Sequence, residues 1–164
     1  MLADFARTGG VGVLKPGALL DDVSGILGPP VAADCFPNAR KSWPRTFRYG
    51  ELRLEVCRCR VIEVVALSTW TESVEIPAAD GAVSAVVPTI TFADVKEVFA
   101  SAGARWELNE FPAVRSQFAA LVELDPVGVR FTFHVPDTGA TDQGGATLHT
   151  AISRSFGHVC GSGA

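Results

Sequence analysis

The stretch WPRTFRYGELRLEVCRCRVIEVVAL, residues 43–67, decides the fold class of this chain. Hydrophobic side chains alternate with charged ones over residues 52–56, and a second apolar alternation runs over residues 62–66. A period of two is typical of a strand with one buried and one solvated face, and two such runs in close succession predict an antiparallel hairpin. The sequence therefore predicts sheet structure here, with Cys57 and Cys59 at or near the tip of the hairpin.

A helical pattern appears on either side of this hairpin. Residues 16–30 place apolar side chains three and four positions apart, and a glycine followed by two prolines ends the run. Residues 89–103 show the same spacing, with Thr91 and Asp94 placed as a near capping box. The sequence predicts a helix in each region, and residues 1–15, with their glycines, read as a loosely held entry. Further strands are expected at 73–78, 116–125, 128–135 and 146–153.

The two halves of the chain match each other in order and in register. Residues 22–23 align with 94–95 at an offset of 72 positions, and residues 52–54 align with 129–131 at an offset of 77. A helix followed by strands occurs in each half, which favours an internal repeat. Sparse identity leaves chance similarity between two amphipathic segments as the alternative.

These patterns predict an α+β fold. We expect two tandem helix-plus-antiparallel-sheet modules, which form one extended or curved sheet with the helices on one face. The whole chain, 1–164, is expected to be a single compact domain with internal modules 14–77 and 87–156 and a linker at 78–86. A chain of 164 residues that is 48% hydrophobic is long enough to bury such a core.

Composition narrows the class of function and the compartment. The net charge is −4 and the basic residues are scattered, which argues against nucleic-acid binding. The first residues lack a signal-peptide pattern, and no run approaches the roughly 20 apolar residues of a membrane span, so we expect a cytoplasmic protein without membrane attachment. Its four cysteines, Cys35, Cys57, Cys59 and Cys160, are then expected to be reduced thiols.

The cysteine pair does not by itself predict a metal site. Structural zinc sites use four ligands, usually as two pairs with at least two residues between paired cysteines. Cys57 and Cys59 have one residue between them, and Cys35 and Cys160 have no cysteine partner nearby in the sequence. We therefore predict no metal and a plain hairpin tip. No phosphate-binding or dinucleotide motif is present either, so no cofactor is predicted.

Two other patterns are weaker candidates for chemistry. The sequence DTGATD, residues 137–142, contains the tripeptide of retroviral-type aspartic proteases, but no later segment completes that motif, and an exposed turn is predicted. His134 and His149 fall on predicted strands and, with Glu123, form a candidate metal or acid–base cluster. Exposed strand histidines without a role are commoner, and His158 in a glycine-rich tail is assigned none. No catalytic residue is predicted.

The order of these motifs resembles a known type of module. LKPGALLDDVSGILGPP, then WPRTFRYGELRLEV, then RVIEVVAL is similar to the small α/β module of β-lactamase-inhibitor-protein-like folds. The resemblance covers residues 14–70 and, more loosely, 89–155. It implies a short helical segment on a four-stranded antiparallel sheet, often in tandem, that binds other proteins. A small acidic α+β chain without catalytic motifs also resembles immunity proteins, which neutralise a cognate toxin.

We therefore expect an inhibitor or immunity protein that blocks a partner enzyme by docking on it. The expected binding residues lie on the uncovered sheet face or supply aromatic contacts, and they are Trp43, Tyr49, Arg53, Glu55, Glu63, Trp70, Arg130 and His134, with Thr132 on the same face. The alternative is a small-ligand-binding or enzymatic α+β domain that uses the histidine-bearing side of the sheet. A structural domain in a larger assembly is a third possibility.

Overall fold

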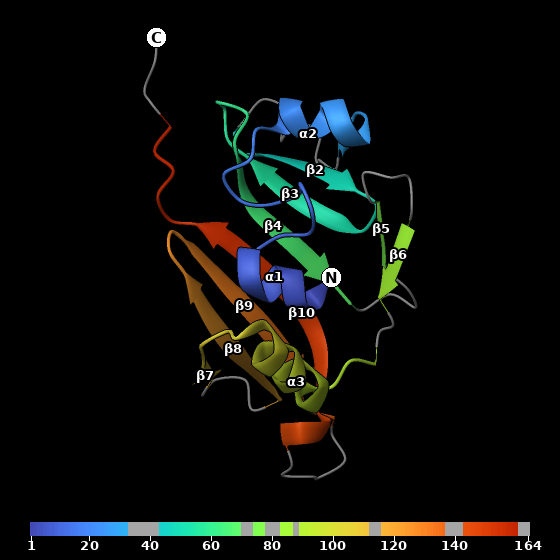
Figure 1. Ribbon diagram of the computed structural model, residues 1–164, viewed down its shortest axis with the longest axis vertical. Coiled ribbons are helices and arrows are strands. Elements are labelled where there is room, and N and C mark those ends of the chain that lie inside the picture. Colours follow the sequence, from blue (N-terminus) through green and yellow to red (C-terminus); the bar gives the residue numbers. More distant parts are fainter. Residues whose placement is uncertain are drawn as a thin grey trace.

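The computed structural model describes residues 1–32, 43–69, 74–77, 83–86, 89–111, 116–136 and 143–160 (Figure 1). In this part of the chain there are three α-helices, α1 (Leu2–Thr8), α2 (Leu20–Leu27) and α3 (Phe92–Ala102), and a short 3-10 turn, Gln143–Gly145. The strands are β1 (Val31–Ala32), β2 (Arg45–Tyr49), β3 (Leu52–Val56), β4 (Ile62–Ser68), β5 (Val74–Pro77), β6 (Val83–Val86), β7 (Trp106–Glu110), β8 (Gln117–Leu124), β9 (Val127–His134) and β10 (Thr147–Ser155).

Eight of these strands form one antiparallel sheet in the order β1-β2-β3-β4-β10-β9-β8-β7, and β5 pairs with β6 in a separate ribbon. Figure 1 shows the three helices over the same face of the large sheet, with α2 over the first half, α3 over the second and α1 between them. The predicted α+β class, with an open antiparallel sheet, is confirmed. Among the described residues no helix has the length and apolarity needed to cross a membrane.

The centre of the sheet is the ladder between β4 and β10, which are the last strands of the two halves. Its middle pair is Ala66 with Ile152, and on either side Val64 pairs with Arg154 and Ser68 with Thr150. Each half thus contributes an antiparallel series of four strands that ends at this ladder. The strand order is the same in both halves when each is read from its helix to the centre.

The connection from helix to sheet also has the same hydrogen bonds in both halves. In each half, the backbone N–H of the first helix residue donates to a carbonyl just before the last strand. A backbone N–H at the start of that strand donates in return to the carbonyl two residues before the helix. These bonds are Leu20 N to Arg60 O (2.8 Å) and Ile62 N to Ala18 O (2.9 Å) in the first half, and Phe92 N to Ala146 O (2.8 Å) and Leu148 N to Ile90 O (2.7 Å) in the second. The register of β3 on β4 matches that of β9 on β10, because Arg53 opposite Ala66 corresponds to Arg130 opposite Ile152.

The core lies between the helices and one face of the sheet. Leu52, Leu54, Val56, Phe131 and Phe133, which the alternation placed on the helix side, are fully buried. Burying an aliphatic or aromatic side chain of this size stabilises a fold by about 1.5–3 kcal/mol. The helices therefore pack on this face because they remove its apolar side chains from water.

The first residues differ from the prediction of a loose entry. Residues 2–8 form helix α1, which ends at Gly9 with a left-handed φ of 72°. Phe5 is fully buried and its ring meets that of Phe131 edge-on at 6.0 Å. The Ser153 hydroxyl, buried in β10, donates to the Gly9 carbonyl and so holds the end of the helix on the sheet. The sequence did not indicate this helix, because Phe5 is followed closely by Gly9 and Gly10, which leaves too short a run for a three-and-four spacing of apolar residues to be recognised.

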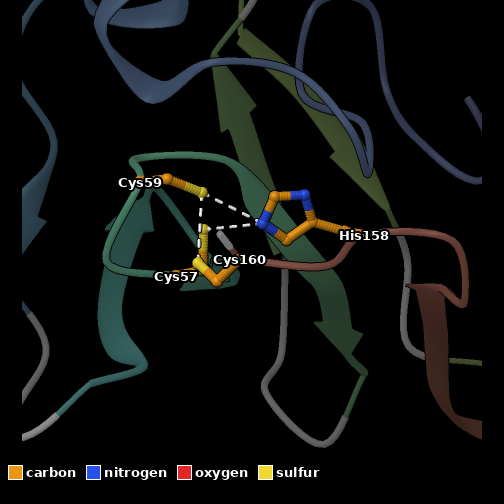
Figure 2. A group of neighbouring side chains, drawn as sticks. All are labelled: Cys57, Cys59, His158 and Cys160. Atoms are coloured by element: carbon orange, nitrogen blue, oxygen red, sulfur yellow. Dashed lines mark hydrogen bonds between the residues drawn. The ribbon is translucent and has the colours of Figure 1, made fainter. Parts of the chain in front are cut away.

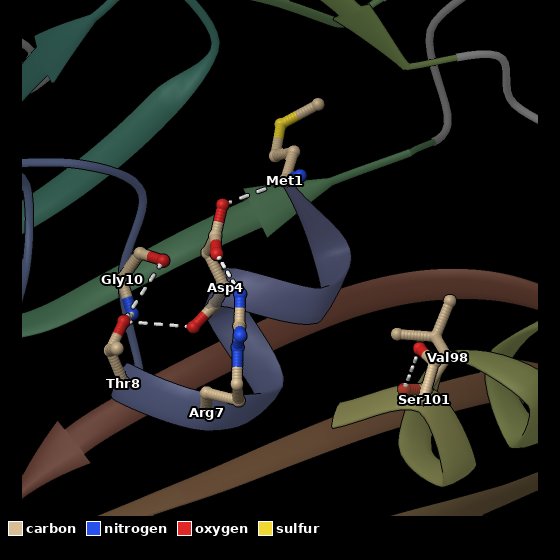
Figure 3. A network of polar contacts seen from close by, with 7 residues as sticks. All are labelled: Met1, Asp4, Arg7, Thr8, Gly10, Val98 and Ser101. Carbon is tan, nitrogen blue, oxygen red and sulfur yellow. Dashed lines mark hydrogen bonds and ion pairs between the residues drawn. The ribbon is translucent and has the colours of Figure 1, made fainter. Parts of the chain in front are cut away.

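Polar contacts complete the local structure of α1 (Figure 3). The Asp4 carboxylate accepts a hydrogen bond from Arg7 Nη2 at 2.6 Å and lies 3.6 Å from the amino group of Met1. The Thr8 hydroxyl donates to the Asp4 carbonyl at 2.8 Å. On the neighbouring helix α3, Ser101 donates to the carbonyl of Val98 at 2.9 Å. These exposed contacts fix the helix ends but leave its outer side charged.

Two further segments differ from the prediction. Strand β6 lies inside the stretch 78–86 that the sequence marked as a linker, and it pairs with β5. Strand β7 was not predicted at all. It is an edge strand whose residues are mostly exposed, and its sequence WELNE alternates only two apolar residues, Trp106 and Leu108, with polar ones.

Candidate functional site

The helices leave the other face of the large sheet uncovered in the described part of the chain, and we call it the open face. Two neighbouring rows of paired residues cross its centre. One row runs Arg53, Ala66, Ile152, Arg130, Leu121, and the next runs Glu55, Val64, Arg154, Gly128, Glu123. Directly paired residues in a sheet share a face, so both rows present their side chains together.

The open face is hollowed where these rows meet. The hollow has a volume of about 470 Å³ and lies over β3, β4, β10, β9 and β8. The exposed ring of Phe156 forms part of its wall and lies over Gly128, where an added Cβ would come within 2.5 Å of the ring. Phe156 also donates its backbone N–H to the Pro126 carbonyl at 2.9 Å. The absence of a side chain at Gly128 thus allows the ring to lie against the sheet.

Charges of both signs line the hollow, with arginine in excess. Arg53 Nη2 lies 3.5 Å from Glu55 Oε1 on the same strand. Arg130 and Arg154 are exposed, and none of the ion pairs found among the described residues includes either of them. Two guanidinium groups beside apolar surface are therefore available to a partner with carboxylates or other anions.

Four of the residues proposed from the sequence lie on the open face. Arg53, Glu55 and Arg130 are in the two central rows, and His134 follows Arg130 at the end of β9 with the same parity. Glu63 does not follow the expected alternation. It is the extra residue of a bulge between the pairs Glu55–Val64 and Val56–Ile62, so its neighbours Ile62 and Val64 lie on opposite faces.

The three proposed aromatic anchors are placed differently. Tyr49 belongs to the core, with 5% of its surface exposed, and its hydroxyl donates to the Gly28 carbonyl at 2.7 Å. It therefore holds the end of α2 on β2 and is removed from the set of binding residues. Trp43 is half-buried against the core, and the Arg45 guanidinium lies 4.6 Å from the centre of its ring. Trp70 lies outside the described residues.

The candidate cluster of His134, His149 and Glu123 is not brought together. Glu123 pairs with Gly128, six residues along β9 from His134, which corresponds to about 20 Å of strand. The segment 137–142, with its protease-like tripeptide, lies outside the described residues.

A second group of chemically reactive side chains does come together, at the turn between β3 and β4 (Figure 2). We call Cys57, Cys59, His158 and Cys160 the cysteine–histidine cluster. Their three sulfurs and one ring nitrogen all lie within 4.8 Å of one another. His158 Nε2 is 3.1 Å from Cys57 Sγ and 3.0 Å from Cys59 Sγ, and the sulfurs of Cys59 and Cys160 are 3.3 Å apart. The cluster joins two short segments that are about a hundred residues apart.

The fold fixes both segments locally. Cys57 N–H donates to the Val61 carbonyl at 2.9 Å and Arg60 N–H to the Cys57 carbonyl at 3.0 Å, which makes a tight turn. Arg60, with a φ of 69°, is held in this turn by Asp21, whose carboxylate accepts from Arg60 Nη2 at 2.7 Å. The second segment follows Phe156 directly and is anchored through it to the sheet.

The thiols of the cluster have unequal acidity. Burial raises the pKa of Cys57 to about 12, and its hydrogen bonds to the other cysteines act in the same direction. The side-chain hydrogen bond from Cys57 lowers the pKa of the exposed Cys59. One buried thiol thus keeps its proton while a neighbouring thiol accepts the hydrogen bond.

The sequence analysis missed His158 and Cys160 as partners of the cysteine pair. The single-residue spacing of Cys57 and Cys59 remains unusual for zinc, but Cys160 is not isolated, because it lies with His158 beside the pair. The available signal was the spacing of His158-Val159-Cys160, which repeats the single-residue separation of Cys57-Arg58-Cys59. Cys35 lies outside the described residues.

Comparison with protein-family models, curated proteins and solved structures gives no match for this chain.

Proposed function

We propose that the protein acts by binding another protein through the open face of its sheet, as an inhibitor or immunity protein that neutralises a partner enzyme. The observation that carries this proposal is the first central row, in which Ala66 and Ile152 lie between the exposed Arg53 and Arg130, with Arg154 exposed in the next row. Interfaces favour such a mixture, because desolvated apolar contacts supply affinity while arginines supply directed hydrogen bonds and charge pairing.

The charge pattern of the open face indicates an acidic partner surface. Arg130 and Arg154 are outside the ion pairs of the described residues, whereas the protein as a whole has a net charge of −4. A local basic patch on an acidic protein steers partners with complementary carboxylates and repels unselective contacts elsewhere. The resemblance of the sequence to β-lactamase-inhibitor-protein-like modules supports the same kind of function.

We also propose that the two halves are an internal repeat related by an approximate twofold axis at the Ala66–Ile152 pair. The support is the recurrence of both helix-to-strand hydrogen bonds and of the β3–β4 register in β9–β10. Under this relation Arg53 and Arg130 are equivalent and flank the axis. An experimental structure in which residues 17–70 and 89–155 do not superpose in the same strand order would end this proposal.

The test uses two double variants and a control. Arg130→Ala with Arg154→Ala, and Arg53→Ala with Glu55→Ala, should change the free energy of unfolding by no more than about 0.5 kcal/mol because the positions are on the surface. Each should weaken inhibition of, or binding to, the co-purified partner enzyme at least about tenfold. Arg7→Ala is the control, since Arg7 is an exposed arginine on α1, on the helix side of the sheet.

Equal binding by both double variants and by the control would refute docking on the open face. The hollow of about 470 Å³ favours one second function, the binding of a small anionic molecule by the same arginines. Native mass spectrometry of the freshly purified chain separates the two. A retained small molecule that is lost in Arg130→Ala with Arg154→Ala, without any bound protein, would replace the inhibitor by a ligand-binding protein.

A further inference from the structure

We propose that the cysteine–histidine cluster is a structural zinc site, with Cys57, Cys59 and Cys160 as thiolate ligands and His158 Nε2 as the fourth ligand. Nothing in the proposed docking function requires this site, which lies at the turn between β3 and β4. The proposal rests on the number, the type and the convergence of the ligand atoms.

The geometry is close to that of a tetrahedral site. Zinc–sulfur bonds of about 2.3 Å and zinc–nitrogen bonds of about 2.0 Å place tetrahedral sulfur ligands about 3.8 Å apart and nitrogen about 3.5 Å from sulfur. In the cluster three of the pairs are 3.0, 3.1 and 3.3 Å apart, and all of the ligand atoms lie within 4.8 Å of one another. Small rotations of the Cys59, His158 and Cys160 side chains, none of which is buried, would bring the four atoms to the zinc distances.

The set of donors selects the metal. Thiolates and one imidazole in a tetrahedral arrangement suit Zn²⁺, whereas Mg²⁺ and Ca²⁺ require oxygen ligands. Four protein ligands leave no open position for water or substrate, so the site has the closed form of structural zinc rather than the open form of a catalytic centre. Binding replaces the thiol protons, which are released to solvent, and involves no change of oxidation state.

A disulfide between Cys59 and Cys160 is the competing explanation, since their sulfurs are 3.3 Å apart. It would engage two of the four side chains only. It gives no reason for His158 Nε2 to lie 3.1 Å from Cys57 Sγ and 3.0 Å from Cys59 Sγ at the same time. A metal accounts for the convergence of all four groups.

The proposed metal joins the β3–β4 turn to the segment that follows β10. Both segments are already positioned from their other ends, by the Asp21–Arg60 contact and by the packing of Phe156 over Gly128. The site therefore closes a loop of about a hundred residues at a place where the chain is nearly in position, which reduces the ordering cost of metal binding.

The direct test measures metal in the full chain, purified under a phosphine reductant. We expect about one zinc ion per chain by elemental analysis, and on replacement by Co²⁺ the intense thiolate-to-cobalt absorption of a tetrahedral site. Chelation should lower the melting temperature, and added Zn²⁺ should restore it. Less than about 0.1 zinc per chain together with no thiolate–cobalt absorption would overturn the proposal.

Variants identify the ligands. Cys160→Ser and His158→Gln lie in the tail and are expected to leave the sheet folded, while each weakens Co²⁺ binding at least about tenfold and alters its spectrum. Cys57→Ser tests the buried ligand, and the two tail variants keep the test valid if this variant fails to fold. The matched control is His134→Gln, which removes a histidine at the end of β9, outside the cluster. Unchanged Co²⁺ binding in both tail variants would refute the assignment.

Discussion

In the first half the buried residues of α2, β3 and β4 are aliphatic, whereas in the second half α3 packs a group of aromatic rings against β8 and β9. Phe92 meets Phe118 and Phe133, with ring centres 4.9 Å apart in both pairs, and Phe99 meets Phe131 at 5.1 Å. Edge-to-face aromatic pairs contribute about 0.5–1.5 kcal/mol beyond the burial of their area. The same strand register is thus stabilised by different side-chain chemistry in the two halves.

The N-terminus of the helix is also more strongly stabilised in the second half than in the first. In α3 the Thr91 hydroxyl accepts from the Asp94 N–H, and the Asp94 carboxylate accepts from the Thr91 N–H, which is a complete capping box. The corresponding residue of α2 is Leu19, which has no side-chain cap, although Asp22 stands three residues later. The second half thus has a capped helix and an aromatic core to which Phe5 of α1 adds a further ring. The helix of the first half has no side-chain cap, and its β3–β4 turn meets the distant tail at the cysteine–histidine cluster.

The largest expected difference between the halves comes from truncation in the core. Phe131→Ala should lower the free energy of unfolding by about 3–5 kcal/mol, because it leaves a cavity and removes ring contacts to Phe5 and Phe99. Leu54→Ala, at the corresponding position of β3, should cost about 2–4 kcal/mol. Urea denaturation of both variants measures the two values, and a larger loss for Leu54→Ala would contradict the comparison.

Removal of the cap of α3 and addition of a cap to α2 should reduce the difference in stability between the two helix N-termini. Thr91→Ala removes the capping box and should cost about 1 kcal/mol. Leu19→Thr supplies the missing hydroxyl in front of Asp22 and should raise the stability by about 0.5 kcal/mol. Thermal unfolding of both variants, with Ser101→Ala as a hydroxyl control inside α3, checks the pair; a loss of stability in Leu19→Thr would show that α2 begins by other means.

The cap of α3 should also depend on pH. The hydrogen bonds from Thr91 hold the pKa of Asp94 below its ordinary value of 3.8. A carboxyl with a lowered pKa in the folded state stabilises that state above the unfolded pKa, and this contribution is lost as the pH falls through the folded value. The difference in stability between the wild type and Asp94→Asn should therefore be constant near neutral pH and shrink below pH 3.8. A difference that grows on acidification would reverse the assigned sign.

The smallest expected effect concerns the wall of the hollow. Gly128→Ala places a methyl group where the Phe156 ring lies, and the ring is 75% exposed and free to rotate outwards. Glycine-to-alanine changes in a strand favour folding by about 0.4–1 kcal/mol, which offsets the lost contact. We expect a net change within about 0.5 kcal/mol but a clear shift of the Phe156 ring signals by NMR. Unshifted ring signals would show that Phe156 does not lie against Gly128 in solution.

Much of this fold could be predicted from the sequence because it depends on local periodicity. The alternation in residues 52–56 and 128–135 located β3 and β9 and their buried faces, and Gly28 and Gly103 marked the helix ends correctly. The bulge at Glu63 could not be predicted, since one extra residue changes the face of every residue on one side of it.

The candidate sites depend on contacts that are distant in sequence. The pairing of β10 with β4 brings His158 to Cys57. In the sequence, therefore, neither the Cys57–Cys59 pair nor the His158–Cys160 pair alone indicates a site with four ligands. The burial of Tyr49 also depends on a distant contact, because its hydroxyl donates to the carbonyl of Gly28, 21 residues earlier. The excess of arginine on the open face likewise appears only when the rows are aligned.

The position of β10 has a consequence for the synthesis of the chain. It comes after both of its neighbours in the chain, yet it occupies the middle of the sheet between β4 and β9. Until residue 155 has emerged, these two strands each present an unpaired edge, and the nascent sheet exists as two separate fragments. Edges of this kind are sites of aggregation, so the nascent sheet is most vulnerable in the interval before β10 pairs. Insertion of a single strand then closes both edges in one step.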